Sequence, residues 1–422
     1  MEENNSLINK INKRVVITGV GLVTPVGNNV NDSWASLCAG KSGITEITRF
    51  DTEASITKIA GEVKNFNAED FLPKKEAKRT PPFISYSIAA AKMALEDSFL
   101  KINPENNNIG VITGCGLGGL ELLEANHKIL LNKGPTRISP FFIPLMIGNM
   151  APGMISIHLG AKGPNSSIAT ACAAGTHAIG ESYSLIKNGV VNAMITGGVE
   201  SVITPLGVGG FNAMKALSTR NDSPEKASRP FDKDRDGFVI GEGAGILIIE
   251  SLEHALERGA KIYAEICGFG MSGDAYHLSA PSPDGDGAAR CMNACINDAD
   301  IKPEQIDYIN AHGTSTKLND LYETKAIKTV FGEYANSIHI SSTKSMTGHL
   351  LGGAGGVETV ITALTIKHGI IPPTINYENP DEECDLNYVP NKALTKQVNY
   401  AMSNSFGFGG TNASILLKKY IE

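Results

Sequence analysis

Three residues far apart in the sequence are of types that take part in nucleophilic catalysis, and the first is Cys172. It follows a run of small residues, and a helix is predicted to begin near Ala173. Backbone amides and the helix dipole at such a position favour a thiolate, so we expect Cys172 to be a nucleophile with a lowered pKa. A small buried side chain is the other interpretation of this cysteine, and the segment alone does not separate the two.

The other two residues are His312 and His349. His312 ends a predicted strand and precedes several hydroxyl residues, and His349 lies in the glycine-rich segment 344–356. Neither has the neighbours of a metal site. Internal repetition predicts that His349 opens a helix equivalent to the one opened by Cys172, which would bring both helix starts together. We interpret His177 as structural, and the remaining histidines as surface or ordinary core residues: His127, His158, His254, His277, His339 and His368.

Internal repetition divides the chain into two halves. Four blocks of the first half recur in the same order in the second, and the paired blocks begin near Arg14 and Lys261, Ile109 and Ile306, Ser166 and His339, and Gly241 and Phe406. This pattern predicts a duplicated α/β unit with halves 12–260 and 261–422 and with apolar strands buried between helices. Helices are predicted over 84–98, 252–258 and 322–330. The segments 123–149 and 215–236 have no counterpart in the second half, and we expect these insertions to cap one face of the fold and build a pocket there.

Three further motifs resemble binding sites for a nucleotide, calcium and zinc, and we predict that none of them binds its ligand. Residues 114–119 match the pattern G-x-G-x-x-G, but no second strand ending in an acidic residue follows at the required distance, so nucleotide binding is not predicted. Residues 232–237 begin like a calcium loop, but Gly243 occupies the twelfth position, and we expect local charge pairing instead. Cys291 and Cys295 lack a third and fourth ligand, which argues against zinc.

Composition limits the class of protein. The chain has 422 residues, of which 42% are hydrophobic and 19% charged, and this excludes a disordered chain. Its net charge of −7 argues against a nucleic-acid partner. Seven scattered cysteines and a polar N-terminus indicate a reducing, cytoplasmic location without a signal peptide. The weakly charged stretch 138–161 contains prolines, so we expect no membrane insertion and interpret it as buried interior or a subunit contact.

Five segments carry a resemblance to a known family. They are TACAAG at 170–175, HGTST at 312–316, KSMTGH at 344–349, NSFGFGGTN at 404–412, and the segment 229–245. Together they resemble the elongating type II β-ketoacyl-acyl-carrier-protein synthases of the thiolase superfamily, over about residues 14–418. The resemblance implies a thiolase-like duplicated αβαβα fold of five layers, and a homodimer.

The resemblance also implies a reaction, a decarboxylating Claisen condensation in two stages. Cys172 would accept an acyl group from acyl-carrier protein, and malonyl-carrier protein would then lose carbon dioxide and attack the acyl-cysteine. His312 and His349, as neutral imidazoles, would stabilise the malonyl thioester oxyanion, and the backbone amides of Cys172 and Phe408 would hold the oxyanion at the acyl-cysteine. Lys344 and Glu358 would support the site. No metal or cofactor is implied, since the phosphopantetheine arm arrives on the carrier protein.

Further roles follow from the same resemblance. Thr314 and Thr316 match positions that hydrogen-bond the phosphopantetheine arm. The acyl-channel residues would be Leu117, Phe211, Phe406 and Phe408, with Phe142 contributed by a partner subunit. The acidic carrier protein needs a cationic dock, and the candidates are Lys74, Lys75, Lys78 and Arg79, with Lys215 and Arg220 as additions. A solvated surface run is the other interpretation of this basic cluster.

Two departures from the family pattern leave acyl length and the pantetheine entrance open. Cys172 is followed by two alanines where many relatives have hydroxyl residues, and Lys317 stands where proline is usual. A polyketide or aryl-polyene ketosynthase is the alternative within this class. A degradative thiolase is disfavoured because its late cysteine base is replaced by Phe406 and Phe408. A non-catalytic chain-length partner is disfavoured because Cys172 is present.

Overall fold

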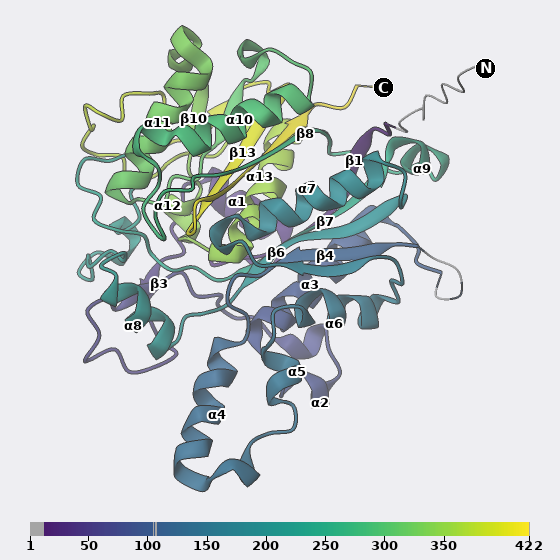
Figure 1. The fold of residues 1–422 in the computed structure, drawn as a ribbon, viewed down its shortest axis with the longest axis vertical. Coiled ribbons are helices and arrows are strands. Elements are labelled where there is room, and N and C mark those ends of the chain that lie inside the picture. Colours follow the sequence, from purple (N-terminus) through teal and green to yellow (C-terminus); the bar gives the residue numbers. More distant parts are fainter. Residues whose placement is uncertain (1–11, 104, 106–107, 422) are drawn as a thin grey trace, which may run out of the picture.

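A single mixed sheet of ten strands runs through the molecule (Figure 1). The computed structural model describes residues 12–103, 105 and 108–421. Five of the ten strands come from the first half of the chain: β1 (Val15–Val23), β4 (Gly110–Gly114), β5 (Asn165–Ile168), β6 (Ala193–Glu200) and β7 (Gly243–Ser251). The other five come from the second half: β8 (Ala264–Gly273), β9 (Tyr308–Asn310), β10 (His339–Ser341), β13 (Tyr400–Gly407) and β14 (Thr411–Lys418).

The two groups of strands have the same topology. The spatial order β5-β4-β6-β7-β1 recurs as β10-β9-β13-β14-β8, and β1 pairs antiparallel with β8 where the groups meet. In each group the second strand is parallel to both neighbours, while the third and fourth are antiparallel. Each paired sequence block supplies strands at equivalent positions, which confirms the predicted duplication.

Helices form three layers around these strands. Helix α3 (Pro82–Ser98) packs with α6 (Met150–Leu159) on the first group, and α10 (Asp286–Asp298) packs with α11 (Lys317–Phe331) on the second. Helices α7 (Ala174–Lys187) and α13 (Ala354–His368) contact each other and strands of both groups. Because both sheet faces are covered, strands such as β1 and β7 are buried along their whole length. The predicted five-layered αβαβα fold is confirmed.

The predicted helices agree with the structure. The segments 84–98 and 322–330 lie within α3 and α11, and 252–258 matches α9 (Leu252–Glu257). Proline at the first position of α3 is favourable because that residue needs no backbone N–H. The remaining elements are α1 (Val30–Cys38), α2 (Lys74–Ala77), α4 (Leu120–Lys133), α5 (Phe142–Met146), α8 (Pro205–Ala213) and α12 (Lys344–Thr347), with short strands β2 (Thr45–Glu46), β3 (Ile59–Ala60), β11 (Ile370–Ile371) and β12 (Leu394–Thr395).

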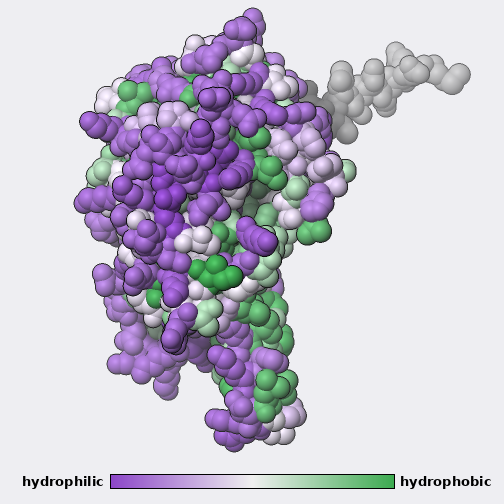
Figure 2. All heavy atoms as spheres, turned by 90° about the vertical axis from the view of Figure 1, so that its left-hand side faces the viewer, coloured by the Kyte–Doolittle hydropathy of each residue, from purple (hydrophilic) through white to green (hydrophobic). Residues whose placement is uncertain are grey.

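The stretch 138–161 differs from the prediction of a buried interior. It forms α5 and α6, and the side chains of Phe141, Ile143 and Ile157 are 46%, 56% and 70% exposed. Helix α4 projects beside them as an arm (Figure 1), and apolar side chains lie along one side of that arm (Figure 2). The buried interpretation is therefore wrong for these three side chains, although Ala151 and Ile155 on the other face of α6 are fully buried. No helix in the described part of the chain is long and apolar enough to cross a bilayer.

Candidate active site

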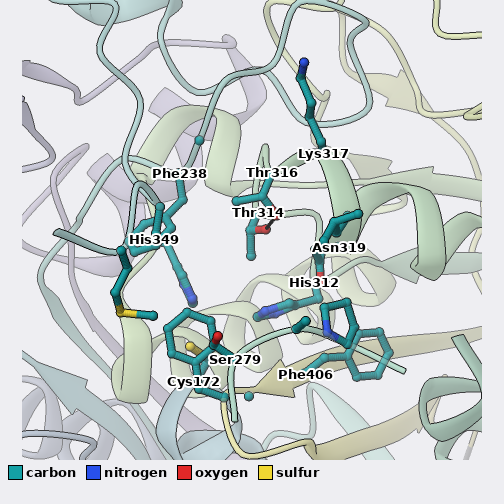
Figure 3. A pocket seen from close by; sticks show the side chains of 18 of the residues that line it. Cys172, Phe238, Ser279, His312, Thr314, Thr316, Lys317, Asn319, His349 and Phe406 are labelled. Carbon is teal, nitrogen blue, oxygen red and sulfur yellow. Dashed lines mark hydrogen bonds between the residues drawn. The ribbon is translucent and has the colours of Figure 1, made fainter. Parts of the chain in front are cut away.

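Cys172, His312 and His349 line one cavity of about 410 Å³, as predicted from their segments. Figure 3 shows both imidazoles pointing toward the space beside the cysteine sulfur. The two imidazole rings lie edge to face with centroids 5.3 Å apart. All three side chains are almost fully buried. The cavity therefore brings a nucleophile and two imidazoles together although they are up to 177 residues apart in the chain.

Short turns position the three side chains. Cys172 lies in a 3₁₀ turn, η3 (Ala171–Ala173), between β5 and α7. His312 follows β9 directly, and His349 precedes a second 3₁₀ turn, η8 (Leu351–Gly353), which leads into α13. Both 3₁₀ turns begin with a non-glycine residue at positive φ, 49° in each case.

The equivalence of the two 3₁₀ turns corrects one prediction. Gly352, rather than His349, occupies the position equivalent to Cys172, and α13 begins only at Ala354. The prediction that His349 opens this helix is wrong. Two backbone hydrogen bonds instead fix His349, whose N–H donates to the carbonyl of Val239 at 2.7 Å and whose carbonyl accepts from Gly241 at 2.9 Å.

The predicted lowering of the Cys172 pKa is also wrong for this structure. Burial raises the pKa of the thiol to about 12, and the positive charge of Lys344 only partly opposes this rise. Desolvation outweighs the helix end because the sulfur is enclosed by apolar side chains. The thiol proton must therefore leave during acyl transfer.

Two backbone amides act on the charge of the Cys172 sulfur. The N–H groups of Phe408 and of Cys172 itself favour its negative charge and so lower the pKa of the thiol, although less than burial raises it. Phe408 lies in the turn between β13 and β14, and that turn lines the cavity. Backbone N–H groups next to a reacting sulfur can stabilise the negative charge that forms on the carbonyl oxygen when the sulfur attacks a thioester.

Both histidines are neutral at physiological pH. Burial lowers the pKa of each imidazole well below its ordinary value, and the charge of Lys344 lowers it further. Nδ1 of His349 accepts from the N–H of Leu351 at 3.3 Å, so the ring proton resides on Nε2. His349 thus presents a neutral N–H donor to the cavity, in agreement with the predicted role.

Lys344 and Glu358 form a buried ion pair behind the histidines. Lys344 begins α12 and Glu358 lies on α13, so the pair connects the segment that carries His349 to the central helix layer. Burial raises the pKa of Glu358 to about 7, and Lys344 opposes that rise. The positive charge of Lys344 adds to the effect of burial, which is the main cause of the lowered pKa values of both histidines.

Two side chains at the site were missed by the sequence analysis. The buried carboxylate of Glu323 accepts from the N–H groups of His312 and Gly313 at 2.8 and 2.7 Å, and this fixes the loop that carries His312. Phe238 places its ring 5.4 Å from that of His349, centroid to centroid. An acidic residue on the buried face of the predicted 322–330 helix was the available signal for Glu323.

The structure places the predicted substrate residues in two groups. The first group lines the cavity and comprises Thr314, Thr316, Phe406 and Phe408. The two threonine hydroxyls are 2.9 Å apart. The second group does not line it. Phe211 packs against the apolar cluster that includes Cys172, Leu117 is half exposed in the turn after β4, and Phe142 begins α5.

The predicted basic residues are also divided. Lys74, Lys75, Lys78 and Arg79 are exposed on α2 and the turn after it, outside the cavity lining. The Arg79 guanidinium lies 4.6 Å from the ring centroid of Phe141. Lys215 lines the cavity together with Lys317, whereas Arg220 donates to the carbonyl of Asp234.

The motifs for other ligands are occupied by internal contacts. Backbone amides of residues 116–118, which a nucleotide phosphate would need, bind the carboxylate of Glu200. Asp232 pairs with Arg229 at 3.0 Å, which confirms the predicted charge pairing. Over residues 12–103, 105 and 108–421, no group of three or more His, Cys, Asp or Glu side chains is arranged to hold a metal ion.

A layered thiolase-like fold with a cysteine and two histidines around one cavity defines the class of ketosynthases. The chain belongs to the beta-ketoacyl synthase family, whose N-terminal domain matches residues 12–255 and whose C-terminal domain matches residues 263–378.

Curated relatives cover nearly the whole chain. A protein of Synechocystis sp., named 3-oxoacyl-[acyl-carrier-protein] synthase 2, is 56% identical over 409 residues, which is 97% of this chain and 98% of the relative. A protein of the same name from Coxiella burnetii is 54% identical over 411 residues, 97% of this chain and 99% of the relative.

Solved structures agree. A beta-ketoacyl synthase from Burkholderia phymatum superposes with a TM-score of 0.91 at 34% identity, covering 97% of this chain and all of that one. A type II polyketide ketosynthase, solved in complex with its acyl-carrier protein, gives a TM-score of 0.89 at 35% identity with the same coverage.

Proposed function

We propose that this protein is a 3-oxoacyl-[acyl-carrier-protein] synthase that elongates fatty acids by condensing acyl-carrier protein with malonyl-carrier protein. The observation that carries the proposal is the convergence of the Cys172 thiol, two neutral imidazoles and two amide donors on one cavity. The curated relatives that bear this enzyme name, at 54–56% identity, support the same substrates.

In the first stage the acyl group moves to the enzyme. The Cys172 sulfur attacks the acyl thioester, a new carbon–sulfur bond forms, and the pantetheine thiol leaves with the proton. The N–H groups of Cys172 and Phe408 hold the tetrahedral oxyanion. Thr314 and Thr316 lie on the cavity wall, where their hydroxyls bind the arm of the carrier protein.

In the second stage malonyl-carrier protein replaces the first carrier. The bond to the carboxylate breaks, carbon dioxide leaves, and its electron pair forms an enolate whose oxygen accepts from the imidazoles of His312 and His349. The enolate carbon then attacks the carbonyl carbon of the acyl-cysteine, and the carbon–sulfur bond breaks to release the 3-oxoacyl-carrier protein. The Cys172 sulfur keeps the electron pair of that bond and takes a proton from solvent, which restores the thiol. The protein needs no cofactor of its own in this proposal, since charge develops only where neutral N–H donors already lie.

The direct test incubates the purified protein with hexanoyl- and malonyl-carrier protein. We expect carbon dioxide release, a 3-oxoacyl-carrier protein product, and an acyl adduct on the intact protein by mass spectrometry. A protein that neither acquires the adduct nor releases carbon dioxide would refute the proposed function. A polyketide ketosynthase would also form the adduct but would continue to extend the unreduced 3-oxo product, so the number of condensations per chain separates the two.

We propose that the basic cluster on and after α2 docks the carrier protein. Its four side chains are exposed, and Arg79 contacts Phe141, next to Phe142. Phe142 is expected to contribute to the acyl channel of a partner subunit, and the basic cluster would then lie beside that subunit's acyl channel. We expect Lys74→Glu with Lys75→Glu to raise the KM for acyl-carrier protein about tenfold without changing kcat. Lys392→Glu, at another exposed lysine, is the control, and an equal effect of both changes would exclude a local dock.

We propose that two copies of the chain form a homodimer through the β5 side of the molecule. Strand β5 ends the ten-stranded sheet, and Asn165 and Ser166 on it are exposed. An edge strand beside exposed apolar side chains of α5 and α6 fits a second copy of the same surface. Light scattering should give twice the chain mass of 44.7 kDa, and the mass of one chain would contradict dimer formation.

We also propose a reducing, cytoplasmic location for the protein, and the seven free thiols support it.

A further inference from the structure

The carboxylate of Glu200 is fully buried at the end of β6 and has no role in the mechanism above. It accepts from four backbone N–H groups, those of Gly116 at 2.7 Å, Leu117 at 3.2 Å, Gly118 at 3.2 Å and Gly352 at 3.3 Å. Three of these donors belong to the turn after β4, and the fourth belongs to η8. One side chain therefore joins two turns that are more than 200 residues apart in the sequence.

The geometry leaves little freedom at this junction. A Cβ atom at Gly116 would lie 2.7 Å from Oε2 of Glu200, and one at Gly352 would lie 2.8 Å from the same oxygen. Such distances are shorter than any ordinary contact, so only glycine lets the turns approach the carboxylate this closely. Burial raises the pKa of Glu200, and the amides of the β4 turn oppose that rise.

The two joined turns carry apolar side chains of the reacting centre. Leu351 of η8 lines the cavity, and Leu120 directly follows the β4 turn. Leu351 belongs to the same apolar cluster as Cys172, and Leu120 and Phe211 pack against that cluster. Leu120 and Phe211 do not line the open cavity, which lies on the side of the two histidines. A long acyl chain that extends from Cys172 away from the two histidines would have to part this cluster.

We propose that Glu200 is a positioning residue for acyl-chain selection: by holding the β4 turn against η8, it sets how readily the cluster around Cys172 opens for a long acyl chain. Short acyl groups fit without opening the cluster and are indifferent to Glu200. The inference rests on the proposed function, since it concerns the acyl group carried by Cys172.

The test measures acylation of Cys172 by intact-mass kinetics with hexanoyl- and hexadecanoyl-carrier protein. Glu200→Gln exchanges one acceptor oxygen for an NH₂ group that opposes the amides, and we expect the long-to-short ratio of acylation rates to rise about fivefold. Gly116→Ala provides a second, milder route because its methyl group pushes only on the carboxylate end, and we expect a change in the same direction. A defect that only lowered the folded fraction would slow both donors equally and leave the ratio unchanged.

Glu242→Gln is the matched control. Glu242 is equally buried and pairs with Arg49, Ser201, Tyr86 and the N–H of Val63, and none of these partners belongs to either turn. The long-to-short ratio of acylation rates in Glu242→Gln should remain within twofold of the wild-type ratio. A ratio that rises less than twofold, or falls, in folded Glu200→Gln or Gly116→Ala would overturn the inference. If Glu200→Gln does not fold, Gly116→Ala decides. Failure of the proposed function is distinguishable, because wild-type protein would then acquire no acyl group from either donor.

Discussion

Cys172→Ala will form no acyl-enzyme and will lose condensation by about 10⁴-fold or more, because the sulfur that carries the acyl group is gone. The change removes one buried sulfur from a packed apolar cluster, so the protein should still fold. Intact mass after incubation with acyl-carrier protein reports the adduct, and quantification of the 3-oxoacyl product reports condensation. Decarboxylation of malonyl-carrier protein should continue, since both histidines remain.

Cys291→Ala is the matched control for this experiment, because Cys291 is fully buried but lies outside the cavity lining. It should acquire the acyl group at the wild-type rate. Condensation by Cys172→Ala at more than a few per cent of the wild-type rate would reject the covalent mechanism.

His312→Ala and His349→Ala will each slow decarboxylation of malonyl-carrier protein by about 10²- to 10³-fold, because each removes one N–H donor to the enolate oxygen. Acylation of Cys172 should remain within about threefold of wild type, since it uses the backbone amides of Cys172 and Phe408. Release of carbon dioxide from malonyl-carrier protein measures the first effect and intact mass the second.

The pH dependence follows from the direction of the pKa shifts. Both imidazoles have pKa values well below the ordinary 6.5, so they are already neutral above that pH and do not change charge as the pH rises further. Ionisation of the two histidines should therefore add no pH dependence to the wild-type decarboxylation rate between about pH 6.5 and 8, and any change in that range is expected from Glu358, whose pKa is about 7.

The control for His312→Ala and His349→Ala is His368→Ala, which changes a histidine packed on Trp34. If His312→Ala or His349→Ala slowed acylation as much as decarboxylation, the cavity would have collapsed rather than lost one N–H donor.

Much of the fold followed from local patterns. The paired blocks predicted the duplication because equivalent strands have to present similar apolar runs to the same helix layers, and the topology agrees. The segment 84–98 was predicted as a helix because its apolar residues recur at the spacing of one helix face. The segment 138–161 was not placed correctly, because low charge indicates burial without specifying whether the chain itself or a second copy provides the cover.

The sequence by itself predicted the candidate reacting residues and their order along a duplicated chain, because short segments around cysteine, histidine and glycine carry both local backbone constraints and the family resemblance. The tertiary structure alone decided the raised pKa of Cys172, the tautomer of His349 and the contacts of Glu323 and Glu200. Each of these depends on desolvation or on a hydrogen bond made only after folding, mostly between segments distant in sequence. Spacing along the chain does not by itself specify such contacts, since they form only once the segments concerned have folded against each other.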